Sequence, residues 1–153
     1  MGVLRSAEAS ERDQVGRGVG VVLLLGVALI HLLDAVNQFD EHKYVFVLYV
    51  LLMAGSLAVA AFLLRTDSRA AWSLVALIAG LTLVGFILSR TTGLPNFDDD
   101  VGNWAEPLGV ASLFTEGSAV ILGLYKLATT PRIERGGLTA AITGSDPKIS
   151  RAN

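Results

Sequence analysis

The stretch that decides the fold is YVFVLYVLLMAGSLAVAAFLL, residues 44–64, which lies between Lys43 and Arg65 and contains no charged residue. The hydrocarbon core of a bilayer is about 30 Å thick, so a helix that crosses it needs about 20 apolar residues at a rise of about 1.5 Å each. A strand of a membrane barrel would instead show alternation over about ten residues. Residues 44–64 therefore predict a membrane-spanning α-helix.

Three further apolar stretches have a similar length, and the last of them is interrupted by Glu116. They are residues 18–33, 70–89 and 107–125. We expect an all-α fold in which the four segments form a four-helix transmembrane bundle. The expected organisation is an N-terminal tail (1–17), a transmembrane domain (18–127) and a disordered C-terminal tail (128–153), since the last segment has Pro, Gly, Ser and charges without an apolar period.

The composition excludes several classes of protein. Apolar residues make up 52% of the chain and charged residues 17%, whereas a soluble domain carries about 25% charged residues. The chain has no cysteine, which excludes disulfides, thiol redox chemistry and iron–sulfur sites. The net charge of −2, with no basic patch, argues against a nucleic-acid partner.

The distribution of Lys and Arg predicts the orientation of the bundle. Ten of the 12 Lys and Arg residues lie in the two tails and in the loop of residues 65–69, and only Lys43 and Arg90 lie in the other two connections. Because cytoplasmic segments of membrane proteins carry this excess, both termini are expected in the cytoplasm. The predicted location is the bacterial cytoplasmic (inner) membrane, with the lipid bilayer as surroundings.

Two connections on the outer side are expected, a short one at residues 37–43 and a longer one at residues 91–105. The longer loop has Gly93, Pro95 and Gly102 as helix breakers, and we expect it to be ordered and folded over the mouth of the bundle. Aromatic residues are predicted at both interfaces. These are Trp72 and Tyr125 on the inner side and Tyr44 and Trp104 on the outer side.

Ionisable residues within the spans are concentrated in the outer half. His31, Asp34 and Gln38 share one face of the first helix, and Ser112 and Glu116 share one face of the fourth. A charge at the bilayer centre costs about 2.5–3.5 kcal/mol on insertion scales, so such groups turn toward one another. We expect a polar pocket open to the outside, with Asp34 paired to Arg90 and His31 paired to Glu116.

A purely structural interpretation stands beside this one. Glu116 would then only fix the register of the bundle through a hydrogen bond, and Arg90 would extend into the lipid headgroups. The candidate ligand-binding residues of the pocket interpretation are His31, Asp34, Arg90, Trp104, Glu106 and Glu116.

Three kinds of chemistry fit those residues. A divalent metal would be held by His31, Asp34 and Glu116, because one imidazole with carboxylates suits such cations, and this would allow a metal-dependent membrane enzyme. A His31–Glu116 relay would suit a proton or ion conduit. A non-enzymatic binding or sensing module, or an accessory subunit, is the most economical hypothesis, with a homo-oligomer or another membrane protein as partner.

Four segments carry a resemblance to a known group. They are HLLD (31–34), SRTTGLP (89–95), GNWAEPLG (102–109) and SLFTE (112–116). Over residues 18–127 the chain resembles a group of uncharacterised small four-helix integral membrane proteins of GC-rich bacteria. The resemblance implies the four-helix fold and no activity or ligand.

Overall fold

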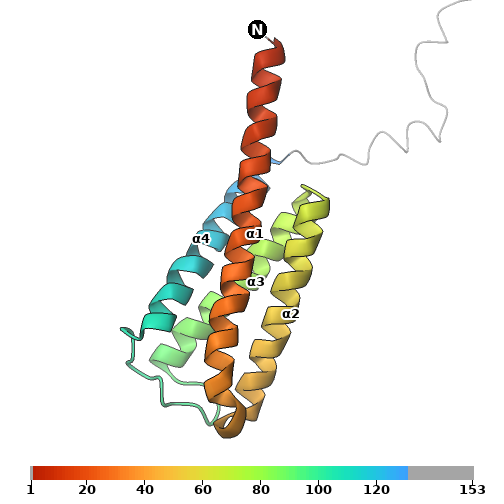
Figure 1. Ribbon diagram of the computed structural model, residues 1–153. Coiled ribbons are helices and arrows are strands. Elements are labelled where there is room, and N and C mark those ends of the chain that lie inside the picture. Colours follow the sequence, from red (N-terminus) through yellow and green to blue (C-terminus); the bar gives the residue numbers. More distant parts are fainter. Residues whose placement is uncertain (1, 131–153) are drawn as a thin grey trace, which may run out of the picture.

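The chain forms four antiparallel helices that run up and down in sequence order (Figure 1). The computed structural model describes residues 2–130 and, within that range, all side chains except those of residues 2–9, 37, 38, 40 and 41. The helices are α1 (Gly2–Glu41), α2 (Lys43–Arg65), α3 (Arg69–Thr91) and α4 (Pro107–Thr129). The all-α four-helix prediction is confirmed, while most of the predicted disordered tail, residues 131–153, lies outside the described residues.

All four helices are long and apolar enough to cross a membrane. The candidate spans are Ser10–Val36, Lys43–Arg65, Arg69–Thr91 and Pro107–Thr129. Large apolar side chains also point away from the bundle, among them Val22, Leu51, Phe114 and Ile121. Lipid tails are as apolar as these side chains, so an outward apolar surface is stable in a bilayer. The chain is a multi-pass membrane protein.

The first helix is much longer than the sequence suggested. α1 has 40 residues and therefore a length of about 60 Å, twice the hydrocarbon core. The loop predicted at residues 37–43 is wrong, because residues 37–41 continue α1 and His42 alone separates it from α2. This stretch has no Gly or Pro, and the ring of Phe39 packs edge-on against Phe46 at 5.1 Å.

The helices close into a ring in which α1 packs mainly on α2 and α3 mainly on α4, while α1–α4 and α2–α3 contacts complete it. We call the end that holds residues 10–17, 66–68 and 126–130 the tail end, and the end that holds residues 42 and 92–106 the loop end. Figure 1 shows α1 continuing past the other helices at the tail end. The Lys and Arg bias predicts that the tail end faces the cytoplasm.

The half of the bundle nearer the tail end has an apolar core. Leu24, Leu63, Val75 and Ala119 are fully buried in it together with Trp72. The prediction of Trp72 as an interfacial residue is therefore wrong. Its indole N–H donates to Asp67 over 2.5 Å, so the ring needs no contact with the headgroup region.

Lys126, counted among the tail charges, lies inside the bundle instead. Its side chain is buried, its Nζ donates to Asp13 over 2.7 Å, and it lies 5.7 Å from the centre of the Trp72 ring. A cation above an aromatic face is attracted to it. Lys126 thus ties α4 to α1 at the tail end.

The loop of residues 92–106 is ordered and folded over the mouth of the bundle, as predicted. Leu94 and Phe97 exchange two backbone hydrogen bonds of 2.7 and 2.8 Å, and the Gly102 N–H donates to the Arg90 carbonyl over 2.9 Å. Gly93 has a φ of 74°, a conformation that only glycine adopts without strain. The resulting turn directs Phe97 into the bundle, where it is buried.

Candidate functional site

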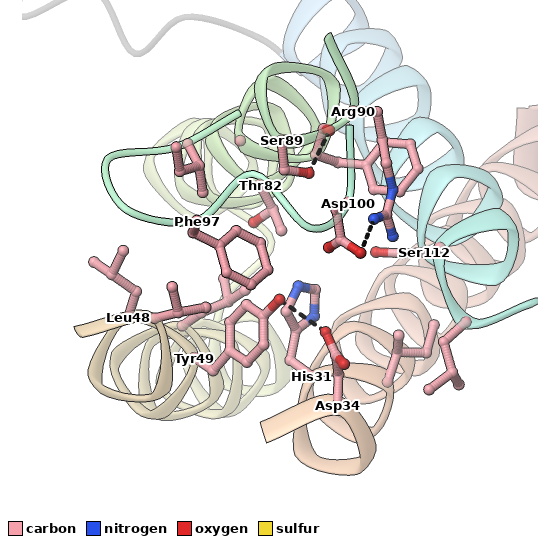
Figure 2. Close-up of a pocket in the computed structure, with 18 of the residues that line it drawn as sticks. His31, Asp34, Leu48, Tyr49, Thr82, Ser89, Arg90, Phe97, Asp100 and Ser112 are labelled. Atoms are coloured by element: carbon pink, nitrogen blue, oxygen red, sulfur yellow. Dashed lines mark hydrogen bonds and ion pairs between the residues drawn. The ribbon is translucent and has the colours of Figure 1, made fainter. Parts of the chain in front are cut away.

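The loop-end halves of the four helices surround a cavity beneath this loop. Its volume is about 270 Å³, and every helix and the loop contribute to its wall. Figure 2 shows polar and aromatic side chains pointing toward one another around it. The polar residues of the wall are His31, Asp34, Tyr49, Thr82, Ser89, Arg90, Asp100, Glu106 and Ser112. The polar residues of α1, α3 and α4 therefore converge, as predicted. Tyr49 of α2 joins them in the wall of the cavity.

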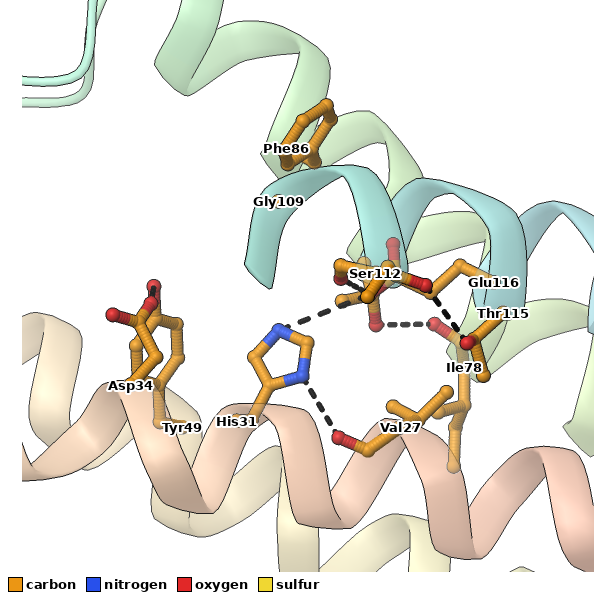
Figure 3. A network of polar contacts seen from close by, with 12 residues as sticks. Val27, His31, Asp34, Tyr49, Ile78, Phe86, Gly109, Ser112, Thr115 and Glu116 are labelled. Carbon is orange, nitrogen blue, oxygen red and sulfur yellow. Dashed lines mark hydrogen bonds and ion pairs between the residues drawn. The ribbon is translucent and has the colours of Figure 1, made fainter. Parts of the chain in front are cut away.

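His31 of α1 and Glu116 of α4 face each other near the floor of the cavity. His31 Nδ1 donates to the carbonyl of Val27 over 2.9 Å, which leaves Nε2 facing Glu116 Oε1 at 3.8 Å (Figure 3). The predicted His31–Glu116 pair is thus confirmed. Because Nδ1 carries the proton of that bond, a neutral imidazole presents its Nε2 lone pair to the site.

Glu116 is fully buried. The Ser112 hydroxyl donates to Glu116 Oε1 over 2.5 Å, while Oε2 has no hydrogen-bond partner among the described residues. A buried polar atom without a partner costs about 1–3 kcal/mol. The hydrogen bond from Ser112 therefore satisfies only one of the two carboxylate oxygens of Glu116.

Asp34 has a different partner from the one predicted. The Tyr49 hydroxyl of α2 donates to Asp34 Oδ2 over 2.8 Å, and the Tyr49 ring lies edge-on to His31 at 5.0 Å. Arg90 pairs elsewhere, so the predicted Asp34–Arg90 pair is wrong. The physical reason is distance, because Asp100 and Glu106 lie within ion-pair distance of the Arg90 guanidinium. Their positions depend on the fold of the loop, which could not be predicted from the sequence.

Arg90 joins α3, the loop and α4. Its Nη1 lies 2.5 Å from Asp100 Oδ1 and its Nη2 lies 3.1 Å from Glu106 Oε2. The guanidinium also sits 5.1 Å from the centre of the Phe86 ring. With 6% of its surface exposed, Arg90 does not extend into the headgroups.

Glu106 is the N-cap residue that precedes α4, and it is one of the two carboxylates that pair with Arg90. Its carboxylate accepts from the backbone N–H groups of Leu108 (3.2 Å) and Gly109 (2.8 Å), which is the usual role of an N-cap. Gly109 allows the close approach, because a Cβ there would lie 2.8 Å from Phe86 and 3.0 Å from Arg90 Nη2. Glu106 therefore lines the cavity while it also holds the helix end in place.

Two of the predicted ligand residues, Glu116 and Trp104, do not line the cavity; Glu116 lies behind Ser112, and Trp104 lies on the outside of the loop. Trp104 is 47% exposed and contacts the edge of Phe86 at 6.1 Å. The loop residues that close the cavity are instead Leu94, Phe97 and Asp100. The loop turns the side chain of Trp104 away from the cavity.

The geometry does not favour a metal centre. Among the residues that the structure describes, no group of three or more His, Asp or Glu side chains is arranged to hold a metal ion. Figure 3 shows Asp34 and Glu116 on opposite sides of His31. The three proposed ligands of a divalent metal therefore do not gather around one point, although two of them face each other.

Sequence reasoning missed Tyr49, Phe97 and Asp100 as parts of the site. Tyr49 is one of three hydroxyl residues in the charge-free stretch 44–64, with Tyr44 and Ser56, and nothing in the sequence distinguishes it from the other two. Phe97 and Asp100 lie in a loop whose path depends on Arg90. Hydrophobic periodicity predicts helices and their faces, but it does not predict a contact between a loop residue and Arg90.

No family model matches the chain, and neither the curated proteins nor the solved structures contain a match to it.

Proposed function

We propose that the chain is a non-enzymatic binding or sensing module that holds a small ligand in the cavity at the loop end. The observation that supports this most directly is the convergence of His31, Asp34, Tyr49 and Arg90 on a cavity of about 270 Å³ covered by an ordered loop. Ligand sites are concave, mostly apolar and supplied with a few placed polar groups. This wall has that character.

The Lys and Arg bias supports the placing of the cavity on the outer side of a bacterial cytoplasmic membrane. A ligand would then enter from outside the cell or from the outer leaflet. Association with a second copy or with another membrane protein stays a prediction.

A proton or ion conduit is the alternative that the His31–Glu116 pair favours. A conduit needs polar groups or water along its whole length. In the described part of the chain, however, the core between Glu116 and the tail end consists of buried apolar residues such as Leu24, Leu63 and Ala119. Liposomes that contain the protein should therefore show the same proton leak with wild type and Glu116→Gln, and a leak that the variant abolishes would favour the conduit.

The proposal is tested by filling the cavity. Gly85 of α3 lines it, and a Cβ there would meet no atom within 4 Å, so Gly85→Leu places a side chain in the cavity without a backbone clash. Gly80→Leu is the matched control, because Gly80 lies in the same helix, is equally open and does not line the cavity.

Native mass spectrometry of protein purified from membranes provides the measurement. We expect a small bound molecule on wild type and on Gly80→Leu that is absent from Gly85→Leu, with all three proteins equally helical. Equal occupancy of the two variants, or no bound small molecule on folded wild type, would contradict the proposal.

A further inference from the structure

The cavity wall carries an excess of negative charge. Three carboxylates line it, those of Asp34, Asp100 and Glu106, against the single guanidinium of Arg90. With His31 neutral, the formal charge of the wall is −2. Charge in a site of low dielectric is costly unless it is paired. A positively charged ligand would therefore be stabilised in the cavity, because it would offset part of the negative charge of the wall.

Of the three cavity carboxylates, that of Asp34 has no cationic partner in the part of the chain that the structure describes. Arg90 is already shared by Asp100 and Glu106 at 2.5 and 3.1 Å. Among the described side chains, Asp34 has only the neutral hydroxyl of Tyr49 as a hydrogen-bond partner. Its side chain is partly buried, and Figure 2 shows it directed into the cavity beside His31. A ligand cation would fill this gap.

The rest of the wall selects what kind of cation fits. Tyr49, Phe86 and Phe97 contribute aromatic rings, and seven further lining residues are aliphatic, among them Leu48, Leu52 and Leu81. Aromatic rings attract cations across their faces. A hydrated metal ion would lose its water against such a surface, whereas an ammonium group that carries apolar substituents would bury them favourably.

An anion fits less well. It would have to displace Asp100 or Glu106 from Arg90, and the Glu106 carboxylate also caps α4. The Nε of Arg90 has no hydrogen-bond partner within the described part of the chain, but the charge of the guanidinium is already balanced. That donor suits a water molecule or a neutral oxygen better than a second carboxylate.

We propose that the ligand of this cavity is a small lipophilic ammonium ion, with its nitrogen at Asp34 and its apolar part between Tyr49, Phe97 and the aliphatic wall. This inference rests on the proposed function, since it names the ligand class of the same site. It goes further because a cavity of this size binds neutral molecules equally well if Asp34 has no part in recognition.

The test uses three probes of the same chain length that differ in charge, namely hexylammonium, hexanol and hexanoate. Each is titrated by calorimetry into the full chain in nanodiscs of zwitterionic lipid, with empty nanodiscs subtracted. We expect hexylammonium to bind at least about tenfold more tightly than either other probe, because a desolvated charge pair contributes that much or more.

Two variants locate the effect. Asp34→Asn should weaken hexylammonium binding by at least about tenfold and leave hexanol unchanged. Asp98→Asn removes the same charge from an exposed loop residue outside the cavity, so it should bind like wild type. If Asp34→Asn does not fold, Asp34→Glu keeps the charge and should keep the preference for the cation.

The outcomes separate the two proposals. If hexanol binds as tightly as hexylammonium and Gly85→Leu abolishes both, the cavity is a ligand site and the cation inference is overturned. If hexylammonium does not bind, or binds Gly85→Leu as well as wild type, the inference is also overturned. The native mass spectrometry above decides the proposed function independently of these probes.

Discussion

The hydroxyl of Tyr49 donates to Asp34 Oδ2 over 2.8 Å and so joins α2 to α1 within the loop-end half of the bundle. It is the only described hydrogen bond between side chains of these two helices. Because the bond satisfies a partly buried carboxylate, it both stabilises the helix pair and presents the second oxygen of Asp34 to the cavity.

Tyr49→Phe should lower the free energy of unfolding by about 1–3 kcal/mol, since it leaves a partly buried carboxylate without its partner. Tyr44→Phe is the matched control in the same helix, because Tyr44 is exposed and has no described hydrogen bond; it should change stability by less than about 0.5 kcal/mol. Denaturant titration in detergent, followed by circular dichroism, measures both. Equal stabilities of the two variants would contradict the role given to this bond.

Gly109→Ala should be destabilising by about 1–3 kcal/mol, because the added methyl group overpacks the contact of Phe86, Glu106 and Arg90. A Cβ there would lie 2.8, 2.9 and 3.0 Å from atoms of those residues. Gly117→Ala, in open space on the same helix, should instead be neutral or stabilising by up to about 1 kcal/mol. The same unfolding titration compares them, and a neutral Gly109→Ala would show that the contact relaxes freely.

Arg90→Lys should loosen the loop over the cavity. A single ammonium group cannot reproduce the fork that reaches Asp100 and Glu106 together. Hydrogen exchange should therefore become faster at the amides of Leu94 and Phe97, which close the loop. Arg65→Lys, at an exposed position, serves as the control, and unchanged exchange in Arg90→Lys would mean that the loop does not depend on the guanidinium.

The orientation can be tested directly because the chain has no cysteine. Asn103→Cys introduces a thiol at an exposed loop-end position, and Thr66→Cys introduces one at the tail end. A membrane-impermeant maleimide should label the first in intact cells and the second only after permeabilisation. The reverse pattern would place the cavity on the cytoplasmic side.

The span at residues 44–64 and the His31–Glu116 pair could be predicted for the same physical reason. Hydrocarbon accepts a helix only if its side chains are apolar, and the few charges that remain must find each other. The Asp34–Arg90 pair followed from the same rule and was wrong. The rule requires that each charge has a partner but does not say which one. Asp100 and Glu106 are the partners of Arg90, and Tyr49 is the partner of Asp34.

Other parts could not be predicted, because they depend on how each helix is rotated and how the loop folds. Tryptophan is common at membrane interfaces, but Trp72 is buried instead, since Asp67 satisfies its indole N–H inside the bundle. Phe97 reaches the cavity only through the turn at Gly93. Four of residues 37–41 are polar, which suggested a loop, yet polar residues continue a helix readily when no Gly or Pro interrupts it.

The continuity of α1 has a mechanical consequence. Asp34 and Asp13 lie on one uninterrupted helix, about 30 Å apart along its axis. A straight helix tilts as a rod, so a displacement of the segment around Asp34 is transmitted to the opposite face of the membrane. There Asp13 accepts a hydrogen bond from Lys126, so a tilt of α1 would change the distance between these two side chains.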